Sequence, residues 1–504
     1  MDVPIPVLFL LLALAPLSHS AVFLNIDCGS SKSFTSADNL KWVGDDSYVK
    51  NGESHGVVEI SNSTPQEIST LRAFTTRNKN CYSIEAGKGE KVLVRARFYY
   101  GNYDKKSFPP TFDLQFDGNH WTSVETTADT TVFYEVIYVL KDDHTSICLA
   151  QTHPNQFPFI SALEVRSIDA KMYTHVHSNY ALFIKHTIAY GASKAIRYPD
   201  DPYDRYWTPE EEDNGYTAVK NDATSIKVEV PEKPPEAVLM NAVTSSSTTE
   251  PLILATKIGI SSVPIYLIMY FSEVTQLDSG QQRSFVFCVD NDIASDPIVP
   301  TYGSVFELYL TNTTATPNTT FSLIATTDST LPPLINAMEL FYVAEQTDGT
   351  NSKDVEGLAT LQSKFSVLKE WTGDPCLPSM FTWDWVNCSS DHVPRVTALY
   401  LNGYGLSGSL PDFSSLDALE TMNLADNNLG GSIPTSLSKN KELNLVISGN
   451  SDLCSSSSNL CEKTKTKTSS GGTKKPSSAS TNKKISELLS IIVGATILSF
   501  FVFF

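Results

Sequence analysis

The sequence predicts a mainly β fold, with two β-sandwiches in tandem followed by a short leucine-rich-repeat solenoid. Short runs of β-branched and aromatic residues fill residues 22–345, with Gly, Asn, Asp or Pro between them. The same kind of run resumes at about Leu252, after a connection rich in Pro, Asp and Glu. A repeat of leucines at a period of 23 residues then begins near residue 400.

Two pairs of similar segments support the tandem arrangement. The β-forming run at residues 92–101 has a counterpart of the same character at residues 265–273. Near the end of each half, an apolar strand is introduced by a similar phrase, at residues 158–165 and 333–340. Two related sandwiches explain this duplication better than one long sheet does. We place the first sandwich at 21–185, and the connector with the second sandwich at 186–350.

The region after the sandwiches combines one helix with the leucine repeat. Residues 354–371 are predicted to be helical because apolar side chains recur every three or four positions: Val355, Leu358, Leu361, Phe365 and Leu368. Further on, Leu401, Leu406 and Pro411 recur 23 residues later as Leu424, Leu429 and Pro434. In such repeats the leucines stack inward, and Asn427 is expected to bond the turning backbone of its neighbour. The helix, a junction and the N-terminal cap occupy 351–392, and the repeats with their C-terminal cap occupy 393–461.

Both ends of the chain carry targeting signals. Residues 7–17 are apolar, and Ser18 and Ser20 precede a cleavage site, which predicts a signal peptide at 1–20. At the other end, a Lys/Ser/Thr/Gly stalk at 462–487 leads into a hydrophobic tail at 488–504. Small residues at Ser477 and Ser478 make this a glycosylphosphatidylinositol (GPI) anchor signal. The alternative is a tail retained as a membrane helix. Either way, we expect the secretory pathway to deliver the protein to the outer face of the plasma membrane.

Charge and motif content narrow the function classes. The formal net charge is −19, and the region after residue 461 has seven Lys against two Glu, so the acidity is concentrated in residues 21–461. An ectodomain this acidic repels phosphate backbones, which argues against a nucleic-acid partner. The chain has no His-Glu-x-x-His, Gly-x-Ser-x-Gly or P-loop motif, so neither an enzyme nor a cofactor is predicted. A carbohydrate-active extracellular enzyme is the alternative from a different class.

The eight cysteines of a secreted chain indicate disulfides. Cys376 and Cys388 are close in sequence, as are Cys454 and Cys461, and we predict a bridge within each pair. The other four leave three connectivities open: Cys28, Cys81, Cys148 and Cys288. Asn-x-Ser/Thr acceptors for glycosylation occur at Asn62, Asn312, Asn318 and Asn387. His175 and His177 would share one strand face, but no third ligand lies nearby in sequence, so no metal site is predicted.

Several phrases resemble the ectodomains of plant malectin-like, leucine-rich-repeat receptor kinases. They include Asn25-Ile-Asp-Cys-Gly, Phe98-Tyr-Tyr-Gly-Asn-Tyr-Asp, the segment from Arg197 to Trp207, and Gly373-Asp-Pro-Cys. The resemblance covers about residues 22–455 and implies two malectin-like sandwiches, a Gly-Asp-Pro-Cys junction and a short repeat block. Because the Gly-rich ATP loop and the His-Arg-Asp loop of kinases are absent, the chain resembles a kinase-less relative. The resemblance implies a recognition or co-receptor role, with a receptor kinase as a candidate partner.

Malectin itself resembles a lectin for glucose disaccharides, so the resemblance suggests a carbohydrate ligand. Sugar binding needs aromatic faces and fixed polar groups, and the segment Tyr99, Tyr100, Asn102, Tyr103 and Asp104 offers both. Trp42, Tyr48 and Trp121 could add walls to the same site. Two alternatives remain: the rings fill the sandwich core, or the protein is a scaffold for a protein or peptide with no affinity for sugar.

Overall fold

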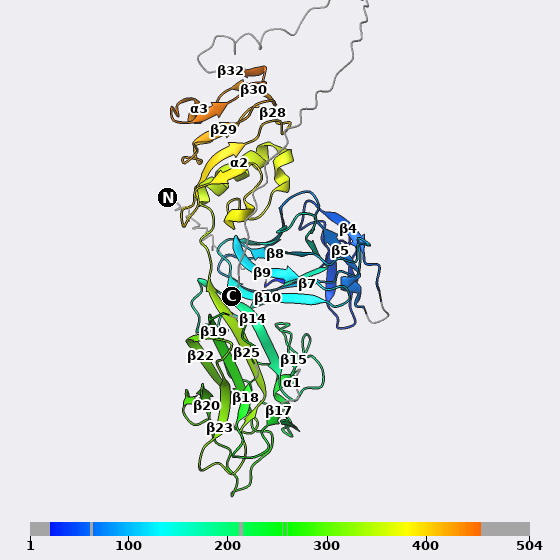
Figure 1. Cartoon of the computed structure of the whole chain (residues 1–504), viewed down its shortest axis with the longest axis vertical. Coiled ribbons are helices and arrows are strands. Elements are labelled where there is room, and N and C mark those ends of the chain that lie inside the picture. Colours follow the sequence, from blue (N-terminus) through cyan, green and yellow to red (C-terminus); the bar gives the residue numbers. More distant parts are fainter. Residues whose placement is uncertain (1–20, 61–63, 211–214, 255, 260, 455–504) are drawn as a thin grey trace, which may run out of the picture. The chain divides into compact units, whose positions relative to one another are not determined.

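The computed structural model describes residues 21–60, 64–210, 215–254, 256–259 and 261–454, and the fold is mainly β, as predicted (Figure 1). The predicted signal peptide, stalk and hydrophobic tail lie outside the described residues, as do Asn62, Cys461, Ser477 and Ser478. Among the helices of the described part, none has both the length and the apolar character needed to cross a membrane.

One long sheet runs through both halves of residues 22–345. Its strand order is β2-β3-β1-β13-β7-β10-β14-β25-β19-β22, and β15 pairs with β14. In chain order the strands are β1 (Phe23–Asp27), β2 (Phe34–Thr35), β3 (Lys41–Gly44), β7 (Lys91–Phe98), β10 (Val132–Val139), β13 (Ala162–Ile168), β14 (Tyr180–Ala189), β15 (Thr208–Pro209), β19 (Val263–Phe271), β22 (Phe306–Ala315) and β25 (Ala337–Glu345). The halves meet where β10 pairs with β14, through Val136 opposite Phe183 and Ile137 opposite Leu182. The expectation of two separate sandwiches rather than one long sheet is therefore wrong for this layer.

Each half keeps a second sheet of its own, ordered β6-β11-β8-β9 in the first half and β18-β23-β20-β21 in the second. These strands are β6 (Lys79–Glu85), β8 (Thr111–Phe116), β9 (Asn119–Glu125), β11 (His144–Ala150), β18 (Leu252–Leu254), β20 (Phe285–Val289), β21 (Asp292–Ile293) and β23 (Phe321–Ala325). Two three-stranded sheets complete the halves: β4 (Glu53–Gly56), β5 (Thr70–Ala73) and β12 (Phe159–Ile160), then β16 (Thr217–Lys220), β17 (Asn241–Thr244) and β24 (Leu334–Ile335).

Alternation along the strands explains how one sheet serves several cores. On β7, Val92 and Val94 belong to the core of the first half, whereas Leu93 faces the opposite way into another cluster. That other cluster also takes Tyr266 from β19 and Phe341 from β25, so it buries apolar surface from both halves. Since β7 is covered on both faces, its residues are buried almost without a break, and the buried set includes the charged Arg95.

The predicted helix at 354–371 divides into two elements. The α-helix α2 spans Ser352–Lys364, with the Asn351 side chain accepting a hydrogen bond from the Lys353 amide, and the 3-10 helix η2 spans Ser366–Glu370. Leu358 and Leu361 are buried in the same cluster as the leucines of the repeat, whereas Val355 is exposed. The helix therefore belongs to the core of the C-terminal region. Short helices also occur elsewhere in the chain, at η1 (Gln66–Ile68), α1 (Glu236–Leu239) and η3 (Ser379–Phe381).

The region with the leucine repeat forms two stacks of short strands. One stack is β26 (Val386–Cys388), β27 (Val396–Tyr400), β29 (Thr421–Asn423) and β31 (Asn444–Val446); the other is β28 (Ser407–Gly408), β30 (Asn428–Ser432) and β32 (Asp452–Cys454), and α3 spans Thr435–Ser438. Strands β27, β29 and β31 pair in parallel with a shift of 23 residues, so that Leu399, Met422 and Leu445 lie in register. Asn427 donates to the carbonyl oxygens of Leu401 (2.7 Å) and Leu424 (3.0 Å) and accepts from the Leu406 amide (2.9 Å).

The cysteines pair only in part. Cys376 and Cys388 form the expected disulfide, and Cys81 joins Cys148 across the neighbouring strands β6 and β11. Cys454 is also disulfide-bonded, but its predicted partner Cys461 lies outside the described residues. Cys28 and Cys288 are free and buried, in different halves. The expectation that they would enter disulfides is thus wrong: each is packed as a small apolar side chain in its own core.

Candidate functional site

Most of the aromatic segment at residues 99–104, the candidate sugar site, packs inside the first half. Tyr100 is fully buried, and its hydroxyl donates to Asp104 (2.5 Å) and accepts from the Phe108 amide (3.2 Å). Tyr99 is 8% exposed and donates to the Glu59 carbonyl oxygen (2.7 Å). The Tyr103 ring packs edge-on against Tyr100. The rings and hydroxyls of Tyr99 and Tyr100 are therefore engaged inside the protein, which favours the core-packing alternative for these two residues.

Two of the remaining candidates for that platform, the tryptophans, are also interior residues. Trp42 and Trp121 are 1% and 7% exposed, and Tyr48 is partly buried against the same core. Asn102 is partly exposed, but its amide group donates to Glu59 and accepts from the Ser107 amide, which closes the turn. Large aromatic rings bury much apolar area in the core of a sandwich. A tyrosine hydroxyl can be buried with them when groups of the neighbouring turn form hydrogen bonds to it.

A buried ionic cluster joins the connector to the first half. Asp204 is fully buried and accepts from Arg166 (2.7 Å) and Arg197 (2.7 Å), while Glu164 accepts from Arg95 (2.9 Å). Burial alone would raise the pKa of Glu164, but the surrounding arginines hold it well below its usual value. These charges are mutually compensated, which fixes the position of the segment from Arg197 to Trp207.

Arg205 connects this segment to a second stretch of the connector. Its guanidinium pairs with Asp201 (2.8 Å) and with Glu339 of β25 (3.2 Å). It also donates to the carbonyl oxygens of Glu232 (2.8 Å) and Lys233 (2.6 Å). One fully buried arginine therefore holds the segment around residue 201 and the segment around residue 232 against the second half.

A groove of about 820 Å³ lies between these two segments. One wall includes Pro202 and Tyr203, the other includes Val230, Pro231 and Pro234, and the charged side chains Lys171, Asp200, Glu229, Lys233 and Glu236 complete the lining. Its volume is within the range of small-molecule and peptide sites, about 300–1,000 Å³. From the sequence, this stretch was predicted only to be a connection. The pattern that could have indicated the groove is Val230-Pro-Glu-Lys-Pro-Pro, whose prolines restrict the backbone to extended conformations.

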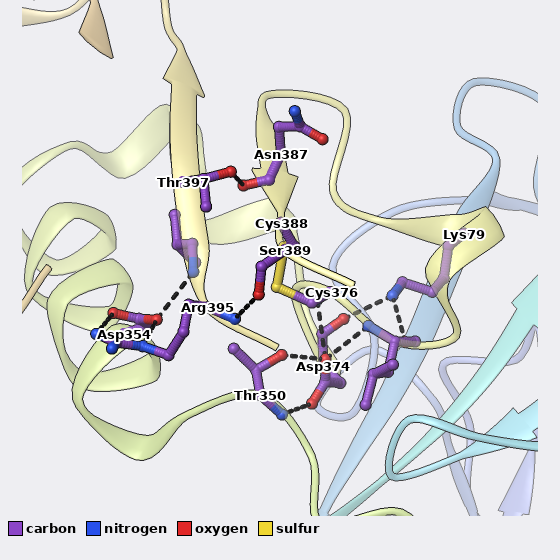
Figure 2. Close-up of a disulfide and its surroundings, with 12 residues drawn as sticks. Lys79, Thr350, Asp354, Asp374, Cys376, Asn387, Cys388, Ser389, Arg395 and Thr397 are labelled. Atoms are coloured by element: carbon purple, nitrogen blue, oxygen red, sulfur yellow. Dashed lines mark hydrogen bonds and ion pairs between the residues drawn. A yellow bond between two sulfur atoms is a disulfide. The ribbon is translucent and has the colours of Figure 1, made fainter. Parts of the chain in front are cut away.

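The Gly-Asp-Pro-Cys junction contains a dense set of hydrogen bonds centred on Asp374 (Figure 2). The Asp374 carboxylate accepts from the amides of Cys376 (2.9 Å) and Leu377 (2.7 Å), and from the amide (2.8 Å) and hydroxyl (2.6 Å) of Thr350. Lys79 of β6 donates to the carbonyl oxygen of Asp374 (2.6 Å). Burial lowers the pKa of the Lys79 ammonium to about 8. The aspartate thereby orders the turn that leads to the Cys376–Cys388 disulfide.

The junction packs on the first half of the malectin-like region. Gly373 has φ +76°, and a Cβ added there would lie 2.6 Å from Cys81 Sγ and 2.8 Å from Cys148 Sγ. Thr372 donates to the Cys81 carbonyl oxygen (3.0 Å). The Arg77 guanidinium lies 3.9 Å from the centroid of the Trp371 ring. The glycine backbone thus lies directly against the Cys81–Cys148 bridge, with no room for a side chain.

The other side of the disulfide is tied to the repeat. Asp354 of α2 is fully buried and accepts from Arg395 Nε (2.8 Å) and from the Val396 amide at the start of β27 (2.9 Å).

Asn387 is exposed, as are the acceptors Asn312 and Asn318. These three predicted glycosylation positions are accessible on the described surface, and their modification stays a prediction.

The malectin-like domain profile matches residues 26–343, which is more than half of the chain and contains the long sheet, the ionic cluster and the groove. The chain belongs to the malectin-like domain family. The resemblance found in the sequence is thereby confirmed. Within the malectin-like region, the long sheet shared by the two halves is the principal structural element.

Relatives with this malectin-like region come from Arabidopsis thaliana. An uncharacterized protein is 40% identical over 66% of this chain and 67% of its own length. The LRR receptor-like serine/threonine-protein kinase IOS1 is 32% identical over 82% of this chain and 47% of its own length. The chain thus spans about half the length of the receptor-like kinases that it matches. Among solved structures, the ANX2 ectodomain from Arabidopsis thaliana has a TM-score of 0.56 at 17% identity, covering 64% of this chain and 97% of that one. A complex of the plant peptide RALF23 with FER and LLG2 has a TM-score of 0.53 at 16% identity, covering 64% and 95%.

Proposed function

We propose that this protein is a recognition subunit of the receptor type, which binds an extracellular peptide in the groove between residues 200–203 and 228–236. The groove supports this proposal, because it offers a large, mainly apolar surface beside the connector, whereas most of the candidate sugar-binding rings are buried. Prolines and valines line it, and they suit an extended peptide better than a pyranose. The negative charge of the chain favours a basic peptide.

The family supports a binding role over a catalytic one. The matched region is the malectin-like part, and relatives that carry it are named as receptor-like kinases. One neighbour of similar fold is described in complex with a peptide and a second protein. We therefore propose a place at the outer face of the plasma membrane, with attachment by the predicted GPI anchor and a receptor kinase as partner. We also propose that the parallel strands at 393–454 are a short leucine-rich-repeat block, supported by the 23-residue register and the bonds of Asn427.

The test is selection of ligands from a displayed library of random peptides, followed by affinity measurement with purified variants. Tyr203 lines the groove, and we expect Tyr203→Ala to weaken the selected peptides at least tenfold. Tyr400→Ala is the matched control, because Tyr400 is an exposed tyrosine on β27 of the repeat region. Equal affinity of both variants and wild type would reject the groove.

The same preparations separate the two alternatives. Retention of soluble wall glucans that depends on Tyr203, with no selected peptide, would assign the groove to carbohydrate. Release of reducing ends from those glucans would instead support the carbohydrate-active enzyme.

A further inference from the structure

Three potential metal ligands meet behind one wall of the groove, although they are far apart in sequence. They are His175 from the turn between β13 and β14, Glu232 from the connector, and Glu307 from β22. One ligand atom from each of them lies within 4.8 Å of the other two. The sequence predicted no metal site because it offered His175 and His177 on a strand without a third ligand. The structure places both histidines in a turn, and the other two donors come from elements that local sequence cannot connect.

Among the described residues, no positively charged side chain forms an ion pair with the carboxylate of Glu232 or Glu307. Glu232 is fully buried; its Oε1 accepts from the Tyr173 amide (3.2 Å) and the Tyr266 hydroxyl (3.2 Å). Within the part of the chain that the structure describes, neither Glu232 Oε2 nor Glu307 Oε2 has a hydrogen-bond partner, although both atoms are buried. The nearby Lys91 ammonium donates to the Met172 carbonyl oxygen instead.

Two ionised carboxylates can only accept hydrogen bonds, so such a pair needs either a shared proton or a cation. Holding two negative charges this close together and away from water costs free energy. A cation removes this cost without protonation, and a fully buried carboxylate with an unpartnered oxygen directed at two other donors is suited to bind one.

The third donor selects the kind of cation. The His175 imidazole is exposed at the edge of the cluster and stacks on the Tyr309 ring, with centroids 3.5 Å apart and an interplanar angle of 21°. Calcium and magnesium prefer oxygen ligands, whereas one imidazole with two carboxylates is a ligand set suited to zinc. We propose that His175, Glu232 and Glu307 bind a divalent transition-metal cation, zinc being the expected ion, with a further coordination position open to solvent.

The cation would join the connector to the long sheet. Glu232 lies between Pro231 and Lys233, both of which line the groove, and Thr174 beside His175 lines it as well. A metal bound at Glu232 would therefore fix one wall of the groove against β22. The metal site rests on its own donor geometry and stands independently of the proposed peptide ligand.

The experiment is calorimetric titration of the full chain, freed of metal with a chelator, using zinc, manganese and calcium chlorides. We expect one zinc ion per chain, and at least tenfold weaker zinc binding in His175→Ala and in Glu307→Gln. His177→Ala is the matched control, since His177 is a nearby exposed histidine outside the cluster, and it should bind zinc like wild type. His175 and Glu307 are preferred over the fully buried Glu232, whose replacement could prevent folding.

Other outcomes overturn the proposal. Zinc affinity that is unchanged in both variants would place any bound zinc elsewhere. Calcium binding that is lost in Glu307→Gln but unaffected in His175→Ala would indicate an oxygen-only site. If no metal binds and Glu307→Gln raises the melting temperature, the carboxyl pair shares a proton instead.

Discussion

Replacing Gly373 by alanine should loosen the junction from the first half of the malectin-like region. The added Cβ would lie 2.6 Å from Cys81 Sγ and 2.8 Å from Cys148 Sγ, whereas packed carbon contacts need about 3.5–4.0 Å. The backbone or the disulfide must therefore move by roughly 1 Å. The left-handed φ of +76° adds a cost of about 1–2 kcal/mol for alanine, and the overlap adds about 1–3 kcal/mol. We expect a loss of about 2–5 kcal/mol in the free energy of unfolding.

Gly403 supplies a matched control for this estimate. It has φ +72°, but a Cβ added there meets no atom within 4 Å, so Gly403→Ala should cost only the backbone strain of about 1–2 kcal/mol. Urea unfolding of both variants measures the difference, and hydrogen exchange should show lost protection at Thr350 and Leu377, whose amides bond to Asp374. Equal losses in the two variants, with those amides still protected, would refute the steric argument.

Two further predictions concern the first half. Tyr100→Ala should lower the free energy of unfolding by about 3–5 kcal/mol because it empties a fully buried site, whereas Tyr100→Phe should cost only about 1 kcal/mol for the bond to Asp104. Thermal melting measures the stability of both variants. A negligible loss of stability in Tyr100→Ala would show that the ring is exposed at the surface. Lys79 has a folded-state pKa lowered to about 8, so between pH 8 and 10 the folded protein binds fewer protons than the unfolded chain, and stability rises with pH. Lys79 keeps some solvent exposure, which reduces the size of the effect. Between pH 7 and pH 10 we expect the free energy of unfolding of wild type to rise by about 2 kcal/mol relative to Lys79→Met, measured by urea unfolding. A difference in unfolding free energy that does not change with pH would contradict a charged, buried ammonium at neutral pH.

Features that depend on local periodicity were predictable from the sequence. The recurrence of Leu401 as Leu424 predicted a 23-residue unit, and the parallel strands pair with that same shift. The repeat also anticipated the bonds that Asn427 makes to neighbouring backbone. Cys376 and Cys388 are close in sequence, so their pairing followed from proximity. In each case the interacting residues are neighbours in a repeating or short segment, where sequence distance and spatial distance agree.

Long-range features were not predictable in this way. The continuity of the long sheet depends on two residue pairs between β10 and β14, which leave no pattern distinct from that of an edge strand. The rings of Tyr100 and Trp42 have the chemistry of a sugar platform, and only their burial shows that they fill a core. The proposed metal ligands join residues 175, 232 and 307 through tertiary contacts that composition and spacing cannot reveal.

The position of β25 has a consequence for how the protein is made. This strand is the last of the malectin-like region to leave the ribosome, yet it lies between β14 and β19 in the finished sheet. During vectorial synthesis β14 and β19 therefore wait with unpaired edges, and β19 with its buried apolar residues is exposed to association with other nascent chains. We therefore expect the second half to need chaperones during synthesis until residues 337–345 arrive. Truncations before residue 337 should aggregate or be degraded rather than accumulate as a smaller domain.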